Sequence, residues 1–229
     1  MDKPKPEIVS SAEWQRARDE LRAAEKEVTR AADALAARRR RLPMVKFDSA
    51  YTFATPTGGK SLLDLFDGRD ELIVYQFMDN GPDRYCPGCT WFTDNIPGSA
   101  PRLLAEKGVT WVVASDMPLE QIERYKARMG WTMPFVSSRG TSFAADCDAG
   151  GGFMLTAFLR DGDEVYRTYS TTARGIERLV FTTGVLDLTP YGRREDWEDS
   201  PAGWPQNPTY VIPVPMAWDH VSTGFGTHR

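Results

Sequence analysis

The sequence predicts an α/β protein built on a mixed β-sheet, with helices on both faces of the sheet. Strand-like and helix-like segments alternate over residues 71–137, the order in which crossover helices join parallel strands. A hairpin pattern follows over residues 153–169, with Asp161-Gly162 at its turn, and adds antiparallel strands. At 229 residues, 41% of them hydrophobic, the chain is long enough to bury one core of this kind.

The first predicted element is a long helix from Ser10 to about Arg41, in an N-terminal arm over residues 1–42. Ser10 and Glu13 have the spacing of a capping box, and Leu42-Pro43 ends the helix. Apolar residues recur in steps of three and four, as in a coiled-coil seam: Trp14, Ala17, Leu21, Ala24, Val28, Ala31 and Leu35. The helix either packs along its own domain or forms a dimerisation arm.

The main domain is predicted over residues 43–185, with short elements that often end at glycine or proline. We expect strands over residues 44–47, 51–54, 71–78, 109–115, 135–137, 153–159 and 164–169. We expect helices over residues 61–66, 91–104 with a break at 97–98, 116–129 and 174–181. Gly59-Lys60-Ser61 resembles the end of a phosphate-binding loop, but Ala54 stands where that loop needs glycine. We therefore interpret residues 57–59 as a hairpin turn.

The C-terminal residues 186–229 differ in composition from the rest and are predicted to form an extended strap. Prolines lie at 190, 201, 205, 208, 213 and 215, and tryptophans at 197, 204 and 218. Disordered tails rarely carry so many aromatic residues. We expect the strap to cover the domain or a neighbouring subunit, and an exposed protein-binding tail is the alternative.

Charge and cysteine content narrow the possible partners and location. A formal net charge of −4 argues against nucleic-acid binding, and the run 38–41 of arginines suits a solvated helix end. No segment approaches the ~20 apolar residues that span a bilayer, and the N-terminus lacks a signal-peptide pattern. Three cysteines are too few for a secreted disulfide scaffold. We expect a cytoplasmic protein with no membrane partner, in which a close cysteine pair is catalytic or metal-binding.

Cys86-Pro87-Gly88-Cys89 is the most informative motif of the chain. It stands between a predicted buried strand and a predicted helix, where free N–H groups and the helix dipole favour negative charge. A thiol with an ordinary pKa of ~8.5 becomes partly ionised in such a place. Cysteines at this spacing can close a small disulfide and open it again, so the motif predicts thiol redox chemistry.

In this interpretation Cys86 attacks a substrate disulfide, and Cys89, one helical turn further on and more buried, resolves the mixed disulfide. Asp79 or Asp83 would manage protons, or would be ordinary solvated loop carboxylates. The residues expected to support the site are Tyr85, Pro87, Gly88, Trp91 and Asp83.

The order strand, Cys-x-x-Cys, helix, strand, helix, strand, hairpin, helix resembles the thioredoxin fold, in the longer form of peroxiredoxin-like proteins. More narrowly, residues ~10 to ~195 resemble the thioredoxin-like family catalogued as domain of unknown function 899. The resemblance implies a dithiol–disulfide oxidoreductase that acts on a protein or small-molecule disulfide or thiol and needs no cofactor. The segments that carry it include 12–14, 61–69, 72–75, 86–89, 128–131, 137–138, 160–163, 169–175 and 186–190.

Three positions depart from the thioredoxin pattern. Thioredoxins carry a cis-proline before the strand that faces the cysteines, whereas residues 152–156 contain no proline. Pro134 precedes a different strand, as in many peroxiredoxin-like chains. Tyr85 stands where a tryptophan commonly precedes the first cysteine.

A thiol peroxidase is the second hypothesis for the same motif. Peroxiredoxins place Pro-x-x-x-Thr-x-x-Cys around the reactive cysteine, and Pro82 and Cys89 match that spacing with Cys86 at the threonine position. Cys89 would then attack peroxide, pass through a sulfenic acid and form a disulfide with Cys86. No arginine that would polarise the peroxide is assignable.

Two non-enzymatic hypotheses remain. Zinc needs about four ligands, and Cys86 and Cys89 would require partners from Cys147, His220 and His228, none of which has a paired spacing. We therefore expect no metal. The fold could also serve assembly alone, with the arm and the strap forming a homodimer.

Overall fold

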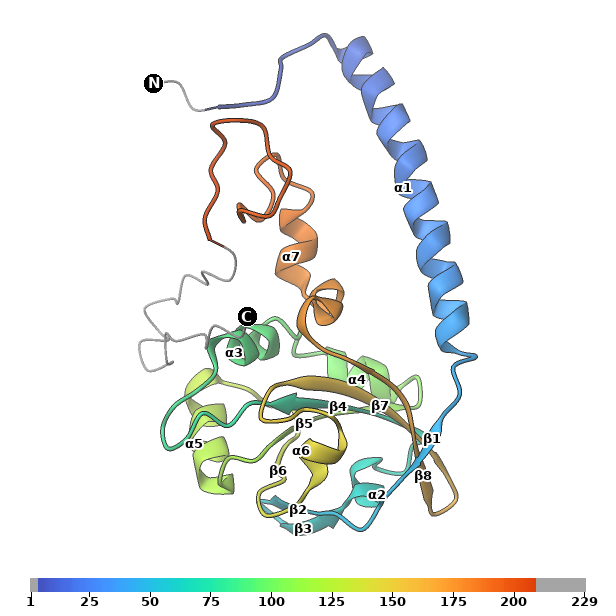
Figure 1. Cartoon of the computed structure of the whole chain (residues 1–229), viewed down its shortest axis with the longest axis vertical. Coiled ribbons are helices and arrows are strands. Elements are labelled where there is room, and N and C mark those ends of the chain that lie inside the picture. The colour runs from blue at the N-terminus through green and yellow to red at the C-terminus, as the bar shows by residue number, and fades with distance from the viewer. Residues whose placement is uncertain (1–3, 209–229) are drawn as a thin grey trace.

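A mixed eight-stranded sheet forms the centre of the computed structural model, which describes residues 4–208 (Figure 1). The strand order is β1-β8-β7-β4-β5-β6-β2-β3. β4 is parallel to β5 and β5 to β6, and all other neighbours are antiparallel. The strands are β1 Val45–Phe47, β2 Thr52–Thr55, β3 Gly58–Ser61, β4 Glu71–Phe77, β5 Val109–Ser115, β6 Phe135–Ser137, β7 Met154–Asp161 and β8 Glu164–Thr171.

Helices cover both faces of this sheet, as the sequence predicts. The helices of the described chain, with and without contact to the sheet, are α1 Ser11–Arg39, α2 Leu62–Leu65, α3 Pro87–Asp94, α4 Ala100–Ala105, α5 Leu119–Met129, α6 Phe143–Asp146, the 3-10 helix η1 Ala173–Leu179 and α7 Phe181–Leu186. β4 shows how the two layers arise, because successive side chains of a strand point to opposite faces. Tyr75 and Phe77 join a core with α3, α5 and η1, whereas Leu72 and Val74 join a second core with α2 and α6.

The central strands have the arrangement that the resemblance implies. β4 leads into the Cys-x-x-Cys segment and lies between parallel β5 and antiparallel β7, and β8 pairs with β7. The fold is therefore the thioredoxin-like, peroxiredoxin-type α/β fold.

Helix α1 begins at the predicted capping box, in which Ser10 and Glu13 satisfy each other's backbone N–H groups. It ends at Arg39, two residues before the predicted end. None of its residues is buried, and it extends well beyond the sheet from the β1 edge (Figure 1). Packing along its own domain is therefore wrong for this helix. Within residues 4–208, no helix is both long and apolar enough to cross a membrane.

Three local details differ from the prediction. The predicted hairpin forms, but its turn lies at Pro56-Thr57, because residues 58–61 form strand β3 and pair with β2. Helix α6 is absent from the prediction, and its Phe143 is held in a cluster of aromatic rings. The expected helix over residues 174–181 is divided at Val180, which is extended.

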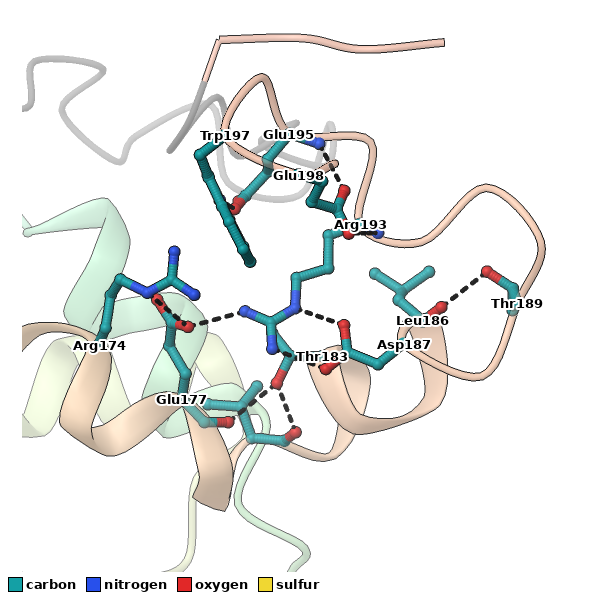
Figure 2. A network of polar contacts seen from close by, with 11 residues as sticks. Arg174, Glu177, Thr183, Leu186, Asp187, Thr189, Arg193, Glu195, Trp197 and Glu198 are labelled. Atoms are coloured by element: carbon teal, nitrogen blue, oxygen red, sulfur yellow. Dashed lines mark hydrogen bonds and ion pairs between the residues drawn. The ribbon is translucent and has the colours of Figure 1, made fainter. Parts of the chain in front are cut away.

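The described part of the predicted strap, residues 187–208, folds back on itself and packs on η1 and α7; we call it the C-terminal loop. Backbone bonds join Asn207 to Arg194 and Asp196 to Asn207. Figure 2 shows Arg193 between Glu177 of η1 and Asp187. Its guanidinium nitrogens donate to both carboxylates at 2.7 Å. The remaining strap residues, among them Pro213, Pro215 and Trp218, lie outside the described part of the chain. The domain boundaries at 42–43 and 185–186 stay predictions.

Candidate active site

Cys86 is the N-cap residue of α3, at the point where the loop from β4 enters the helix. Its backbone is extended (φ −67°, ψ 119°), and its Sγ accepts a hydrogen bond from the backbone N–H of Cys89 at 3.3 Å. Pro87 follows at the first helical position, where a missing N–H does no harm. The sulfur therefore takes the place of the side-chain oxygen that usually caps a helix.

The surroundings of Cys86 favour its thiolate. The Cys89 thiol donates a hydrogen bond to it, and the backbone N–H groups of Cys89 and Gly88 point at the same sulfur. Burial opposes ionisation, but the hydrogen bonds outweigh it and lower the pKa of Cys86 to about 7. Near neutral pH about half of the reduced molecules would carry this thiolate.

Cys89 has the opposite character. It is fully buried, and burial raises the pKa of its thiol well above the ordinary value, as do its bond to Cys86 and the charge there. Two donors partly offset this rise in pKa: the backbone N–H of Met78 and the hydroxyl of Tyr75. The pair thus combines an ionisable outer thiol with a protonated inner one. Only 5% of Cys86 is exposed, so the surroundings cover both sulfurs closely.

A stack of tyrosines forms one side of the site. The ring of Tyr85 lies parallel to that of Tyr125 in α5, with centroids 3.6 Å apart. The Tyr125 hydroxyl lies 2.7 Å from Thr90 Oγ1, which donates to the Cys86 carbonyl at 2.8 Å. This chain of contacts ties the entry of α3 to α5.

The other predicted site residues lie at the margin. Trp91 is partly buried against the same core. Asp83 is exposed and paired with Arg124 at 3.1 Å, while Asp79 accepts from the Gly81 N–H. Neither carboxylate is among the groups that shift the pKa of the two cysteines.

Cys147 lies on the other face of the sheet, in the core that α2 and α6 cover. Burial raises the pKa of its thiol to about 12. The structure therefore does not bring Cys147 to the Cys86–Cys89 pair. His220 and His228, the other ligands considered for zinc, lie outside the described residues. Within residues 4–208, no group of three or more His, Cys, Asp or Glu side chains could hold a metal ion.

Sequence reasoning did not find Tyr75, Thr90 or Tyr125 as members of the site. Tyr75 could have been found. It stands two residues before Phe77 in the strand that leads to the cysteines, and residues two apart in a strand point to the same face. Thr90 and Tyr125 gave no such signal, since they stand 35 residues apart in the sequence and only the folded packing brings α5 to α3.

Fold and dithiol together define a thioredoxin-like protein with a Cys-x-x-Cys motif at a helix N-terminus. Residues 3–210 match the family described as "Bacterial protein of unknown function (DUF899)". The chain belongs to this family, as the resemblance implied. No curated protein matches the chain.

Several solved structures are similar to this chain over a little more than half of its length. Peroxidoxin BcpB from Mycobacterium tuberculosis is 18% identical, with 58% of this chain and 88% of that chain covered, at a TM-score of 0.42. A secreted M. tuberculosis disulfide oxidoreductase homologous to E. coli DsbE is 14% identical, with 56% and 90% covered, at 0.37. A protein from Bacteroides thetaiotaomicron described as a putative disulfide isomerase is 18% identical, with 62% and 91% covered, at 0.39. Likenesses of this size do not assign an activity.

Proposed function

We propose that this protein is a thiol–disulfide oxidoreductase in which Cys86 attacks and Cys89 resolves. The observation that carries the proposal is the Cys86 sulfur at the cap of α3, 3.3 Å from the Cys89 N–H, with its pKa lowered to about 7. A nucleophilic cysteine has to be a thiolate at working pH, and a resolving cysteine is better kept protonated until the first step is complete.

The exchange proceeds in two steps. The Cys86 thiolate attacks one sulfur of a substrate disulfide, the Cys86–substrate bond forms, and the other substrate sulfur leaves as a thiolate that takes up a proton. Cys89 then loses its proton and attacks Cys86 Sγ, which releases the second substrate thiol and leaves a Cys86–Cys89 disulfide. The substrate gains two electrons and two protons, and an external dithiol such as dithiothreitol returns the protein to its reduced form.

The neighbouring residues support this assignment by shaping the site. Pro87 and Gly88 allow the tight entry into α3, and the Gly88 N–H faces the Cys86 sulfur. Tyr85 and Trp91 would form the walls that a substrate meets. Asp83 stays at the exposed rim, since its carboxylate is paired with Arg124.

The lowered pKa of Cys86 and the raised pKa of Cys89 support Cys86 as the nucleophile, and this favours the oxidoreductase over the peroxidase hypothesis. Peroxide attack by Cys89 would require an anion at a fully buried sulfur whose pKa is raised. Peroxide consumption by the Cys86→Ser variant, with Cys89 intact, would reverse this ranking.

Insulin reduction with dithiothreitol tests the proposal. We expect Cys86→Ser to abolish catalysis, and Cys89→Ser to trap a mixed disulfide that mass spectrometry detects. Cys147→Ala is the matched control, because it removes a thiol from the opposite core. Equal activity of Cys86→Ser and the wild type would contradict the assignment. Activity lost in Cys147→Ala alone would move the reactive thiol to the other face.

We also propose that α1 binds a second copy of this chain. Its large apolar residues recur at every seventh position and are exposed: Trp14 by 56%, Leu21 by 56%, Val28 by 70% and Leu35 by 41%. Alanines stand between them in the seam, and small residues let two helices approach closely. An apolar row of this length supports a partner helix of the same kind, because soluble monomers seldom leave such a surface uncovered.

A further inference from the structure

A cavity of about 360 Å³ lies at the carboxyl ends of β4, β5 and β6. Its walls are the loop after β4, the first half of α5 after β5, and Arg139 after β6. These three strands are parallel, and ligands of open α/β sheets bind outside the carboxyl ends of such strands. The segment after β4 also carries Cys86, so the cavity and the dithiol lie at the same edge of the sheet. A volume of this size suits a small molecule.

The cavity borders the dithiol. A β-bridge pairs its residue Asp79 with Tyr85, which precedes Cys86 in the chain. Paired residues have Cα atoms about 5 Å apart, so the Cα atoms of Asp79 and Cys86 lie within roughly 9 Å of each other. Tyr85 also stacks on Tyr125, which follows the cavity residue Arg124 in α5. The two Cα atoms of a disulfide are about 5.5–6 Å apart, so a small disulfide held in the cavity by one end can extend to Cys86.

The charged groups of the cavity differ in how firmly they are paired. Arg124 contacts the carboxylates of Glu120 and Asp83 at 2.9 and 3.1 Å. Arg139 and Asp79 are 3.9 Å apart, which is too far for a hydrogen bond. Arg139 and Asp79 therefore form an open ion pair, into which a ligand with both charges can be inserted.

Both members of the open pair are placed by backbone contacts. Asp79 accepts from the Gly81 N–H through Oδ1 at 2.8 Å, and its Oδ2 faces Arg139. The Arg139 guanidinium donates to the Asp116 carbonyl at 3.4 Å, and its side chain is 61% exposed. An ammonium and a carboxylate on one carbon atom complement this arrangement, because the guanidinium donates to carboxylate oxygens and the ammonium donates to Asp79.

We propose that this cavity binds the amino-acid end of a small disulfide of the cystine type, with the ligand's carboxylate on Arg139 and its ammonium on Asp79. The inference rests on the proposed exchange reaction and names its substrate class. Cys86 and Cys89 give up two electrons and two protons as their disulfide forms, and the two sulfurs of cystine take them up to give two cysteines.

Burial and charge both favour this class of substrate. Cys86 is 5% exposed, and a thin disulfide reaches such a sulfur more readily than a folded protein does. Among the described residues, three carboxylates and two guanidinium groups line the cavity. A zwitterionic end is therefore accommodated better than an end with a net negative charge.

Oxidation of the reduced full-length protein by excess cystine tests the proposal. Free thiols are alkylated at each time point, and mass spectrometry measures the Cys86–Cys89 disulfide. Uncharged 2-hydroxyethyl disulfide is the reference substrate. Arg139→Met should lower the ratio of the cystine rate to the reference rate by about three- to tenfold, as for loss of a charge-assisted hydrogen bond at an exposed site. Comparison of variants with the same two disulfides cancels the intrinsic reactivity of each.

Two modified substrates locate the contacts. Cystine dimethyl ester lacks the carboxylates, so Arg139→Met should not lower its rate relative to the reference. N,N′-Diacetylcystine lacks the ammonium groups, so Asp79→Asn should slow the reaction of cystine and not that of this compound. The asparagine of Asp79→Asn keeps an oxygen for the Gly81 N–H, so the loop retains its turn.

Arg84→Met is the matched control, because Arg84 is an exposed arginine of the same loop that is not among the residues lining the cavity. It should leave the cystine ratio at the wild-type value. An unchanged ratio in Arg139→Met, or equal losses in Arg139→Met and Arg84→Met, would overturn the inference. So would equal effects of Arg139→Met on cystine and its dimethyl ester, or of Asp79→Asn on cystine and N,N′-diacetylcystine. If the reference disulfide also fails to oxidise the wild type, the exchange reaction itself fails, and the inference fails with it.

Discussion

Cys86 and Cys89 lie one helical turn apart but differ in pKa, because Cys86 accepts hydrogen bonds whereas Cys89 donates one to it. Cys86 receives bonds from Cys89 and from backbone N–H groups at the start of α3, whereas Cys89 donates its proton outward and is fully buried. The same turn of helix therefore produces one thiolate and one thiol. In the proposed exchange, this asymmetry sets the order in which the two sulfurs react.

Alkylation of the reduced, folded protein with iodoacetamide should follow this asymmetry. The thiolate is the nucleophile, so the rate at Cys86 should rise with pH and reach half its plateau at about 7. Cys89 and Cys147 should stay unmodified over the same range, because burial raises the pKa of both thiols. Peptide mapping by mass spectrometry identifies the labelled residue. A half-maximal rate near the ordinary thiol pKa of ~8.5 would contradict the stabilised thiolate.

The contribution of the Thr90 hydroxyl to the stability of the protein can be measured with one substitution. Its hydroxyl joins the Cys86 carbonyl to the Tyr125 hydroxyl inside the core, so Thr90→Val should lower the free energy of unfolding by about 1–3 kcal/mol. Thr29→Val is the control, since Thr29 makes a similar hydroxyl–carbonyl bond on the exposed surface of α1. Urea unfolding measures both variants, and equal losses of stability would contradict a special role for the Thr90 bridge.

At the scale of elements, α1 carries an apolar seam that nothing in the described chain buries. If two copies pair through this seam, Val28→Glu should place a charge in the interface and dissociate the dimer. Lys26→Glu introduces the same residue on the outer side of the helix and should leave the dimer intact. Sedimentation equilibrium gives the masses. A monomeric wild type, or a dimer that survives Val28→Glu, would contradict the pairing.

Elements with a strong local pattern could be predicted from the sequence. β4 and β5 are apolar runs, α1 has a capping box, and α5 ends at Gly130, whose φ of 69° suits glycine. α6 and the break at Val180 could not, because they depend on tertiary contacts. Thr183, for example, donates to the carbonyls of Glu177 and Val180 and so holds the junction between η1 and α7.

The same division holds for the candidate site: its local motif was predictable from the sequence, and its tertiary contacts were not. The Cys86–Cys89 spacing and its position after a strand indicate the chemistry, because helix geometry follows directly from local sequence. Tyr75 shares a core with Cys89 because of how α3 lies across β4, and no local pattern encodes that packing. The low exposure of Cys86 likewise depends on how the elements around it pack.

At the scale of the whole molecule, the C-terminal loop is connected to the dithiol through η1. Ile176 and Val180 belong to the core that contains both sulfurs, and Thr182 of α7 bonds Asn95, the C-cap of α3. Glu177, next to Ile176, binds Arg193 of the C-terminal loop (Figure 2). Contacts made by the C-terminal loop therefore bear on the packing around Cys86.

Arg193→Met tests whether this connection controls access to the site. Arg193 is 13% exposed at its side chain and pairs with both Glu177 and Asp187, so its loss removes both ion pairs and leaves only Arg174, 3.5 Å from Glu177, at this cluster. Loss of the two ion pairs should loosen residues 187–208 and raise their amide hydrogen exchange by about tenfold or more. η1 should then pack less firmly, and alkylation of Cys86 should become faster at unchanged pH midpoint.

Arg194→Met is the control, because it removes an exposed arginine from the neighbouring position without touching either carboxylate. It should change neither hydrogen exchange nor alkylation. Faster exchange in Arg193→Met with an unchanged alkylation rate would show that the C-terminal loop is anchored by Arg193 yet does not govern the dithiol. A lowered pH midpoint would mean that the loop acts on the charge of Cys86, whereas a faster rate at the same midpoint isolates access as the quantity that the loop controls.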